Sequence, residues 1–175
     1  MKIASAVVED AKDIASVHIH SWQSAYAEIL DHKWLLTALS IETRARCWEE
    51  IIEANDSKTV VSRHEGRVTG FISFGKCRDE GATAAQGEIW ALYTAPEVWG
   101  QGTGHALIEH AASALRGAGF TSMSLWVLSA NHHGVKFYEG RGFKRVPGSE
   151  KVFELGGRHV KELKYVRQLD RKELT

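Results

Sequence analysis

Apolar residues follow two different spacings along this 175-residue chain. Some segments carry them at every second position, which predicts β-strands, and others at intervals of three or four, which predicts α-helices. Helical spacing occurs after Asp10, from about Trp34 to Ala54, over Gln101–Arg116 and over Asn131–Glu139. Strands precede, separate and follow these helices, which predicts an α/β fold with a mixed sheet and helices on both faces. The expected strands are Lys2–Val8, Thr59–Ser62, Val68–Phe74, Glu88–Thr94, Ser122–Leu128, Lys151–Leu155 and His159–Val166.

Capping and turn residues mark where several of these elements begin and end. Asp10 is expected to cap the first helix, and Ser40, with Thr43 three positions later, to cap the second. The residues His-Glu-Gly-Arg predict a tight turn and therefore a hairpin, and two consecutive glycines predict a closing hairpin near the end of the chain. No repeat or linker interrupts the pattern, so residues 1–175 are expected to form one domain.

The segment Gly87–Gly104 combines a strand, a proline, three alternate glycines and the start of a helix. Glycine lets the backbone approach a ligand closely and turn its N–H groups toward it. The helix that follows adds unpaired N–H groups and the positive end of its dipole. This arrangement predicts a phosphate-binding loop that needs no cationic side chain.

Composition and charge narrow the classes of function. Lys and Arg together number 22, as do Asp and Glu, so the formal net charge of zero argues against a nucleic-acid or anionic-membrane partner. Neither a signal sequence nor a run of roughly 20 apolar residues is found, so a cytoplasmic protein with no membrane partner is expected. Two cysteines and nine histidines show no recognised zinc spacing, so no metal is expected.

Two blocks of the chain resemble the GNAT superfamily of acetyl-CoA-dependent N-acetyltransferases. The family signature Q/R-x-x-G-x-G/A falls on Trp99-Gly100-Gln101-Gly102-Thr103-Gly104, with Trp99 at the usual Gln or Arg position. The second block, LWVLSANHHGVKFYEGRGF, follows after a helix of suitable length. The resemblance implies the GNAT fold, a mostly antiparallel twisted sheet of about seven strands with helices on both faces, and acetyl-CoA as co-substrate.

The resemblance also implies how acetyl-CoA would be bound. In the family, the fourth and fifth strands splay apart and the pantetheine arm enters the gap. Backbone groups of the fourth strand would bind acetyl-pantetheine, the amides of the glycine loop would bind the pyrophosphate, and side chains of the second block would lie near the pantetheine and thiol. The residues so implied are Leu92, Tyr93, Thr94, Trp99, Gly100, Gln101, Gly102, Thr103, Gly104, His105, Asn131 and Phe137.

Two residues are candidates for proton transfer. An amine attacks a thioester only in its neutral form, and an alkyl amine with a pKa near 10.4 is about 0.1% neutral at pH 7, so a general base helps. Glu88, twelve residues before Gly100, is the candidate base; the alternative is that it pairs with a cation at the strand end. Tyr138 is the candidate acid for the departing thiolate, as in the family; the alternative is a packing role.

The acceptor site is less clearly marked in the sequence. Trp22 and Tyr26 lie four positions apart on a predicted helix and share a face, so with Trp90 they could line an aromatic slot for an apolar or cationic group. The alternative is that all three fill the core. Strict alternation would place Trp90 on one face of its strand with Glu88 and Leu92. Asp79 and Glu80, together with Glu88, could form a small acidic rim.

These observations predict direct acetyl transfer from acetyl-CoA to a primary amine of a small molecule or amino acid. Alternatives are a protein N-terminal or lysine acetyltransferase and a catalytically silent acyl-CoA sensor. An acetyltransferase acting on aminoacyl-tRNA is disfavoured by the neutral charge balance. The sequence leaves open whether the protein is a monomer or a homodimer.

Overall fold

The computed structural model describes residues 1–169, whose seven strands form one sheet in the order β1-β2-β3-β4-β5-β7-β6. Every neighbouring pair is antiparallel except β4 and β5, which are parallel. The strands are β1 (Lys2–Ser5), β2 (Lys58–His64), β3 (Arg67–Lys76), β4 (Gln86–Thr94), β5 (Ser122–Leu128), β6 (Lys144–Leu155) and β7 (Arg158–Gln168).

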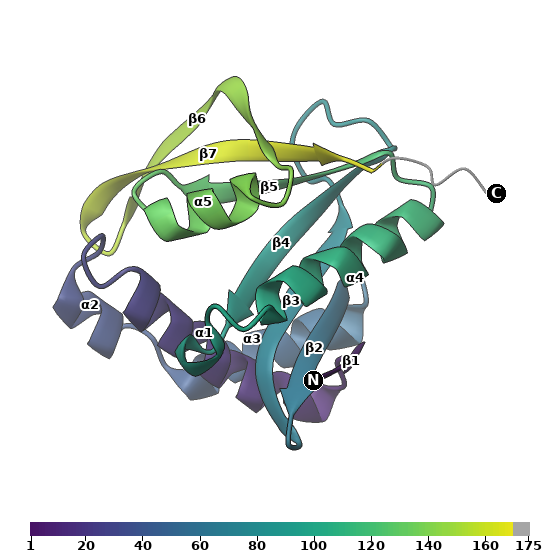
Figure 1. The fold of residues 1–175 in the computed structure, drawn as a ribbon. Helices are drawn as coiled ribbons and strands as arrows, with labels where there is room; N and C mark the ends of the chain where they lie inside the picture. The colour runs from purple at the N-terminus through teal and green to yellow at the C-terminus, as the bar shows by residue number, and fades with distance from the viewer. Residues whose placement is uncertain (170–175) are drawn as a thin grey trace.

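The helices cover both faces of the sheet, as predicted (Figure 1). Helices α1 and α3 enclose one core against β2 and β3, which contains Trp48 and Phe71. Helix α4 and residues of α5 pack on the other face, around Leu107 and Phe143. The helices are α1 (Ala11–Ala25), α2 (His32–Thr37), α3 (Ile41–Ala54), α4 (Thr103–Gly117) and α5 (His132–Glu139), with short 3-10 turns at Val8–Asp10 and Pro96–Val98.

Local signals in the sequence account for several boundaries. The Ser40 hydroxyl accepts a hydrogen bond from Thr43 N at 3.3 Å, which confirms the predicted cap of α3. The turn between β2 and β3 has positive φ at both Glu65 and Gly66, the backbone of a tight hairpin. The region expected as one helix from Trp34 is two helices, because the second begins at its own cap. No helix within residues 1–169 has the length and apolar character needed to cross a membrane.

Strands β4 and β5 diverge after a short paired stretch. Their register comprises three pairs, Gln86 with Ser122, Gly87 with Met123 and Glu88 with Ser124. Beyond these pairs β4 continues beside β3 and β5 continues beside β7, so a gap opens between them (Figure 1). The splay that the family resemblance implied is therefore present.

Candidate functional site

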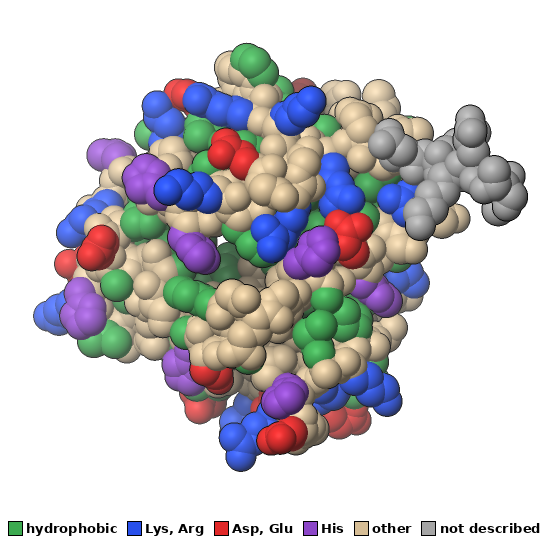
Figure 2. Space-filling model, viewed as in Figure 1, with side chains coloured by type: hydrophobic (Ala, Val, Ile, Leu, Met, Phe, Trp, Pro, Cys, Tyr) green, Lys and Arg blue, Asp and Glu red, His purple; other side chains and the backbone are tan. Residues whose placement is uncertain are grey.

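A cavity of about 1170 Å³ occupies the region where β4 and β5 diverge. Its walls come from α1, β4, the loop before α4, β5, α5 and the β6–β7 hairpin. Figure 2 shows it as a hollow in this face of the molecule, with hydrophobic side chains inside and basic and histidine side chains near the rim. The cavity holds most of the predicted site residues and extends from the glycine loop to the aromatic residues of α1.

The glycine loop forms one end of this cavity. Gly100 and Gly102 have φ of +76° and +86°, and a Cβ built on either would meet nothing within 4 Å. The first hydrogen bond within helix α4 runs from Ala106 N to Gly102 O. The N–H groups of Thr103, Gly104 and His105 come before it and have no acceptor within the helix. Three free donors on residues that line the cavity fit a pyrophosphate.

Gln101 differs from its neighbours in the loop. Its backbone N–H donates to Val98 O at 3.2 Å, and its side-chain Nε2 donates to Glu97 O at 2.9 Å. Unlike Gly100 and Gly102, it does not line the cavity. Its amide therefore stabilises the turn before the helix, whereas it had been expected to face the ligand.

Trp99, which replaces the usual Gln or Arg of the signature, connects the loop to α5. Its indole Nε1 donates to Thr94 O at 3.0 Å, and its ring stacks on His133 with centroids 5.7 Å apart. Both rings line the cavity. The tryptophan thus fixes the loop against the end of β4 and the start of α5, a role that a Gln or Arg side chain would fill differently.

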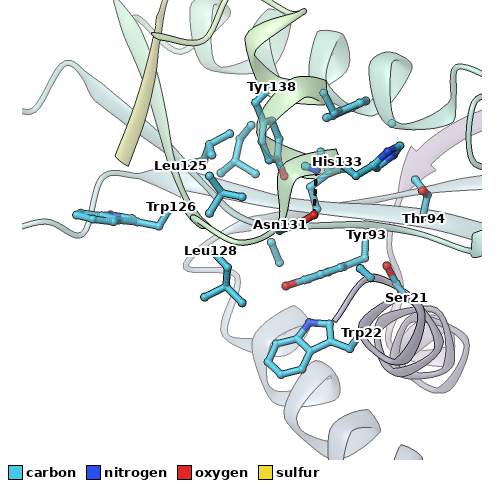
Figure 3. A pocket seen from close by; sticks show the side chains of 18 of the residues that line it. Ser21, Trp22, Tyr93, Thr94, Leu125, Trp126, Leu128, Asn131, His133 and Tyr138 are labelled. Atoms are coloured by element: carbon cyan, nitrogen blue, oxygen red, sulfur yellow. Dashed lines mark hydrogen bonds between the residues drawn. The ribbon is translucent and has the colours of Figure 1, made fainter. Parts of the chain in front are cut away.

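Helix α5 is fixed by its own cap and by contact with α4. The Asn131 side-chain oxygen accepts a hydrogen bond from Gly134 N at 3.0 Å, so its carbonyl orients the helix (Figure 3). Phe137 lies against the first turn of α4, where a Cβ at Gly104 would be 2.9 Å from its ring. The Arg141 guanidinium lies 3.9 Å from the centre of the Phe137 ring. Gly104 is therefore needed for close packing between the two helices.

Tyr138 follows on the same helix and faces the cavity. In Figure 3 its hydroxyl and that of Tyr93 approach the cavity from opposite sides. Its ring contacts Phe137 and Phe143 edge-on, which fixes the direction of the hydroxyl. Burial raises the pKa of Tyr138 well above its ordinary value. The phenol is therefore protonated at neutral pH, the state a proton donor needs.

Glu88 lies at the base of the gap and is only 2% exposed. Arg78 binds its carboxylate through three donors: the backbone N–H to Oε2 at 2.8 Å, Nη2 to Oε1 at 2.5 Å, and Nε to Oε1 at 3.2 Å. The cation pair that was the alternative to a catalytic role is thus present. These bonds occupy both carboxylate oxygens and leave less capacity to accept a proton from a substrate.

A bulge in β4 changes which residues share a face. The register with β3 shifts between Ser73 and Phe74, which leaves Trp90 as an extra residue. Leu92 therefore packs toward the α4 core, on the face opposite Glu88. The expectation that Glu88, Trp90 and Leu92 lie on one face is wrong, because strict alternation does not continue through a bulge.

The far end of the cavity is aromatic. Trp22 lies 5.3 Å from Tyr26 and 6.4 Å from Tyr93, centroid to centroid, and Trp34 adjoins it at 6.5 Å. Burial raises the pKa of Tyr26 well above its ordinary value. Among the described residues Trp90 makes no aromatic contact with this group; Arg78 covers its ring at 4.4 Å. Tyr93, expected near the cofactor, contributes its side chain here instead.

Of the three residues that could form an acidic rim, Asp79 and Glu88 line the cavity, and both are paired with cations. Asp79 accepts bonds from Lys164 at 2.7 Å, Lys151 at 3.1 Å and Trp126 Nε1 at 3.2 Å. Burial opposes ionisation of Asp79, but the two lysines outweigh it and lower its pKa. Within residues 1–169, no group of three or more His, Cys, Asp or Glu side chains could hold a metal ion.

Arg78 and Glu162 are among the polar residues of the cavity wall that sequence reasoning missed. Arg78 follows β3 in a segment that could be recognised only as a polar loop. Glu162 lies on β7, in the predicted closing hairpin, where alternation places it on one face with Val160. That alternation was visible in the sequence, but nothing in it indicates that this face meets α1.

Comparisons with known proteins agree with this geometry. The acetyltransferase (GNAT) family matches residues 17–143. YuaI of Bacillus subtilis (strain 168), described as an uncharacterized N-acetyltransferase, is 36% identical over 165 residues, which cover 92% of this chain and 89% of that protein.

Solved structures share the fold. Ribosomal-protein-alanine N-acetyltransferase from Brucella melitensis has a TM-score of 0.75 and 19% identity, covering 97% of this chain and 100% of that one. YncA from Salmonella typhimurium, with its cofactor acetyl-CoA, has a TM-score of 0.74 and 22% identity, covering 100% of this chain and 97% of that one. The family match over residues 17–143 and the 36% identity with YuaI identify the chain as a member of the GNAT family of acetyltransferases.

Proposed function

We propose that this acetyltransferase moves the acetyl group of acetyl-CoA to a primary amine of a small molecule or amino acid, by direct attack in a ternary complex. Acetyl-CoA supplies the activated thioester. The amides of Thr103, Gly104 and His105 would hold its pyrophosphate, and the β4 backbone at Leu92 and Thr94 would border the pantetheine arm. Open space at Gly100 and Gly102 supports this assignment.

The observation that carries the choice of a small acceptor is the packing that bounds the far end of the cavity. The β6–β7 turn packs on α2, where a Cβ at Gly156 would lie 2.9 Å from the Trp34 ring. Leu128 and Val160 pack with Tyr26 and with α2 in one apolar cluster. This wall favours a compact amine over an extended polypeptide, so protein N-termini and lysines are the second candidate.

Tyr138 would give its proton to the sulfur as the carbon–sulfur bond breaks. The phenol is protonated at neutral pH, and after the transfer its proton is regained from solvent. Phe137 and Phe143 hold the ring in place for this step.

The test is release of free thiol from acetyl-CoA in the presence of separate panels of small amines, amino acids and peptides. Turnover is expected with small primary amines and not with peptides of ten or more residues. Turnover with peptides alone would refute the small-acceptor assignment. Acetyl-CoA binding without turnover on any panel would refute the enzymatic proposal and favour a sensor.

A further inference from the structure

Glu162 is placed at the acceptor end of the cavity by the register of β7. It pairs with Leu128 of β5 on one side and with Lys151 of β6 on the other. Val160, two positions earlier on the same face, packs with Tyr26. Glu162 itself is half-buried and lines the cavity. Its carboxylate therefore lies on the wall that faces α1.

The carboxylate of Glu162 takes part in none of the hydrogen bonds or ion pairs formed within residues 1–169. Its cross-strand neighbour Lys151 is used elsewhere, since its ammonium bonds Asp79 at 3.1 Å and lies 3.6 Å from the Trp126 ring centre. Lys164, on the same face of β7, bonds Asp79 at 2.7 Å. Glu162 thus differs from Glu88 in having no dedicated cation.

The surroundings of Glu162 complete a site for a cation. Burial raises the pKa of its carboxyl, with Lys151 acting in the opposite sense. Burial is the main cause of the raised pKa of Tyr26 and of Tyr93, and the charge of Glu162 acts in the same direction on both. All three residues line the same end of the cavity. The Trp22 ring lies beside both tyrosines. A carboxylate beside aromatic faces is suited to a primary ammonium group.

We propose that Glu162 binds the ammonium group of the acceptor and takes its proton, so that Glu162 is the general base of the reaction. This inference rests on the proposed function. The proton passes from nitrogen to the carboxylate, which frees the lone pair that forms the carbon–nitrogen bond. The carbon–sulfur bond breaks, and the sulfur takes the Tyr138 proton. The second proton on nitrogen and the proton on Glu162 are released to solvent, and Tyr138 takes one proton back from solvent. One proton is therefore released overall.

Phenethylamine is a suitable probe because it joins a primary ammonium to an aromatic ring. Its binding to the CoA-saturated protein is measured by calorimetry, with phenethyl alcohol as the uncharged analogue. Glu162→Gln should weaken phenethylamine binding at least tenfold and leave phenethyl alcohol binding unchanged. Glu154→Gln, an exposed glutamate of β6 outside the cavity, is the matched control and should change neither. Equal phenethylamine affinity in wild type and Glu162→Gln, or no binding to wild type at tens of millimolar, overturns the proposal.

The pH dependence of turnover separates proton transfer from simple binding. In wild type, kcat should fall as pH falls through the raised pKa of Glu162. In Glu162→Gln that inflection should be absent and kcat should drop about 100-fold. A variant with higher KM but unchanged kcat and pH profile overturns the general-base role. Phenethylamine binding that depends on Glu162, with no turnover on any amine, would support the ammonium site while refuting the proposed function.

Discussion

His18 makes the stability of this protein sensitive to mild acid. It is 8% exposed, stacks on Tyr93 with centroids 4.5 Å apart, and its Nδ1 accepts a hydrogen bond from Trp48 Nε1 at 3.3 Å. Burial, assisted by the nearby positive charge of Arg44, lowers the pKa of His18 from 6.5 to about 3. The folded protein therefore holds this imidazole neutral at pH values where the unfolded chain protonates it.

The sign and size of the effect follow from proton linkage. Above pH 6.5 both states are neutral at His18 and the stabilisation is complete; it is lost as pH falls from 6.5 toward 3. Each pH unit in that window changes the free energy of unfolding by about 1.4 kcal/mol. Between pH 7 and pH 5, His18 alone should therefore lower the free energy of unfolding by about 2 kcal/mol.

Urea unfolding at pH 7, 6 and 5, followed by tryptophan fluorescence, measures this loss. His18→Gln cannot titrate, and its amide oxygen can still accept from Trp48, so its free energy of unfolding should fall by about 2 kcal/mol less than that of wild type. His20→Gln on the exposed side of α1 is the control and should follow wild type. Parallel losses in wild type and His18→Gln would refute the reasoning.

Three further substitutions test the rest of the site. Tyr138→Phe should lower kcat about 100-fold with little change in acetyl-CoA affinity, because only the proton donor is lost; wild-type turnover would exclude the acid role. Gly102→Val should weaken acetyl-CoA binding at least tenfold by calorimetry, since φ of +86° strains any β-branched residue there; an unchanged Kd would contradict the loop assignment. Glu88→Gln should lower the free energy of unfolding in urea by about 1–3 kcal/mol, because it weakens the contacts with Arg78. The same substitution should leave the pH profile of turnover unaltered; a shifted profile would return the base role to Glu88.

Several features set by local sequence could be predicted, whereas features set by pairing between distant segments could not. The expected side-chain cap at Asp10 is wrong, because its carboxylate accepts from Val7 N and pairs with Arg63. The β2–β3 turn, the Ser40 cap and the bounds of β5 follow from residues adjacent in the chain, and all match the structure. The bulge at Trp90, which reverses the alternation of side chains along β4, depends on how β3 pairs with β4. The alternation of the sequence alone therefore did not predict it.

The same distinction holds within the candidate site. The glycine loop is one continuous segment between a strand and a helix, as the sequence predicted, and it lines the cavity except at Gln101, whose amide is used in a turn. The partner of Glu88 lies ten residues earlier and the wall that carries Glu162 comes from the far end of the chain. Their roles depend on tertiary contacts that no local pattern contains.

The contact between Gly156 and Trp34 has a consequence for how acceptor range could evolve. One ring against one glycine, together with the bond from Arg158 to Ile29 O at 3.4 Å, joins the β6–β7 turn to the region around α2. Neither partner belongs to the glycine loop or to α5. A longer turn, or a smaller residue at position 34, would remove this contact and widen that end of the cavity without altering the glycine loop. Under the proposed function, a few substitutions at this contact alone could therefore extend the range of acceptors toward larger amines.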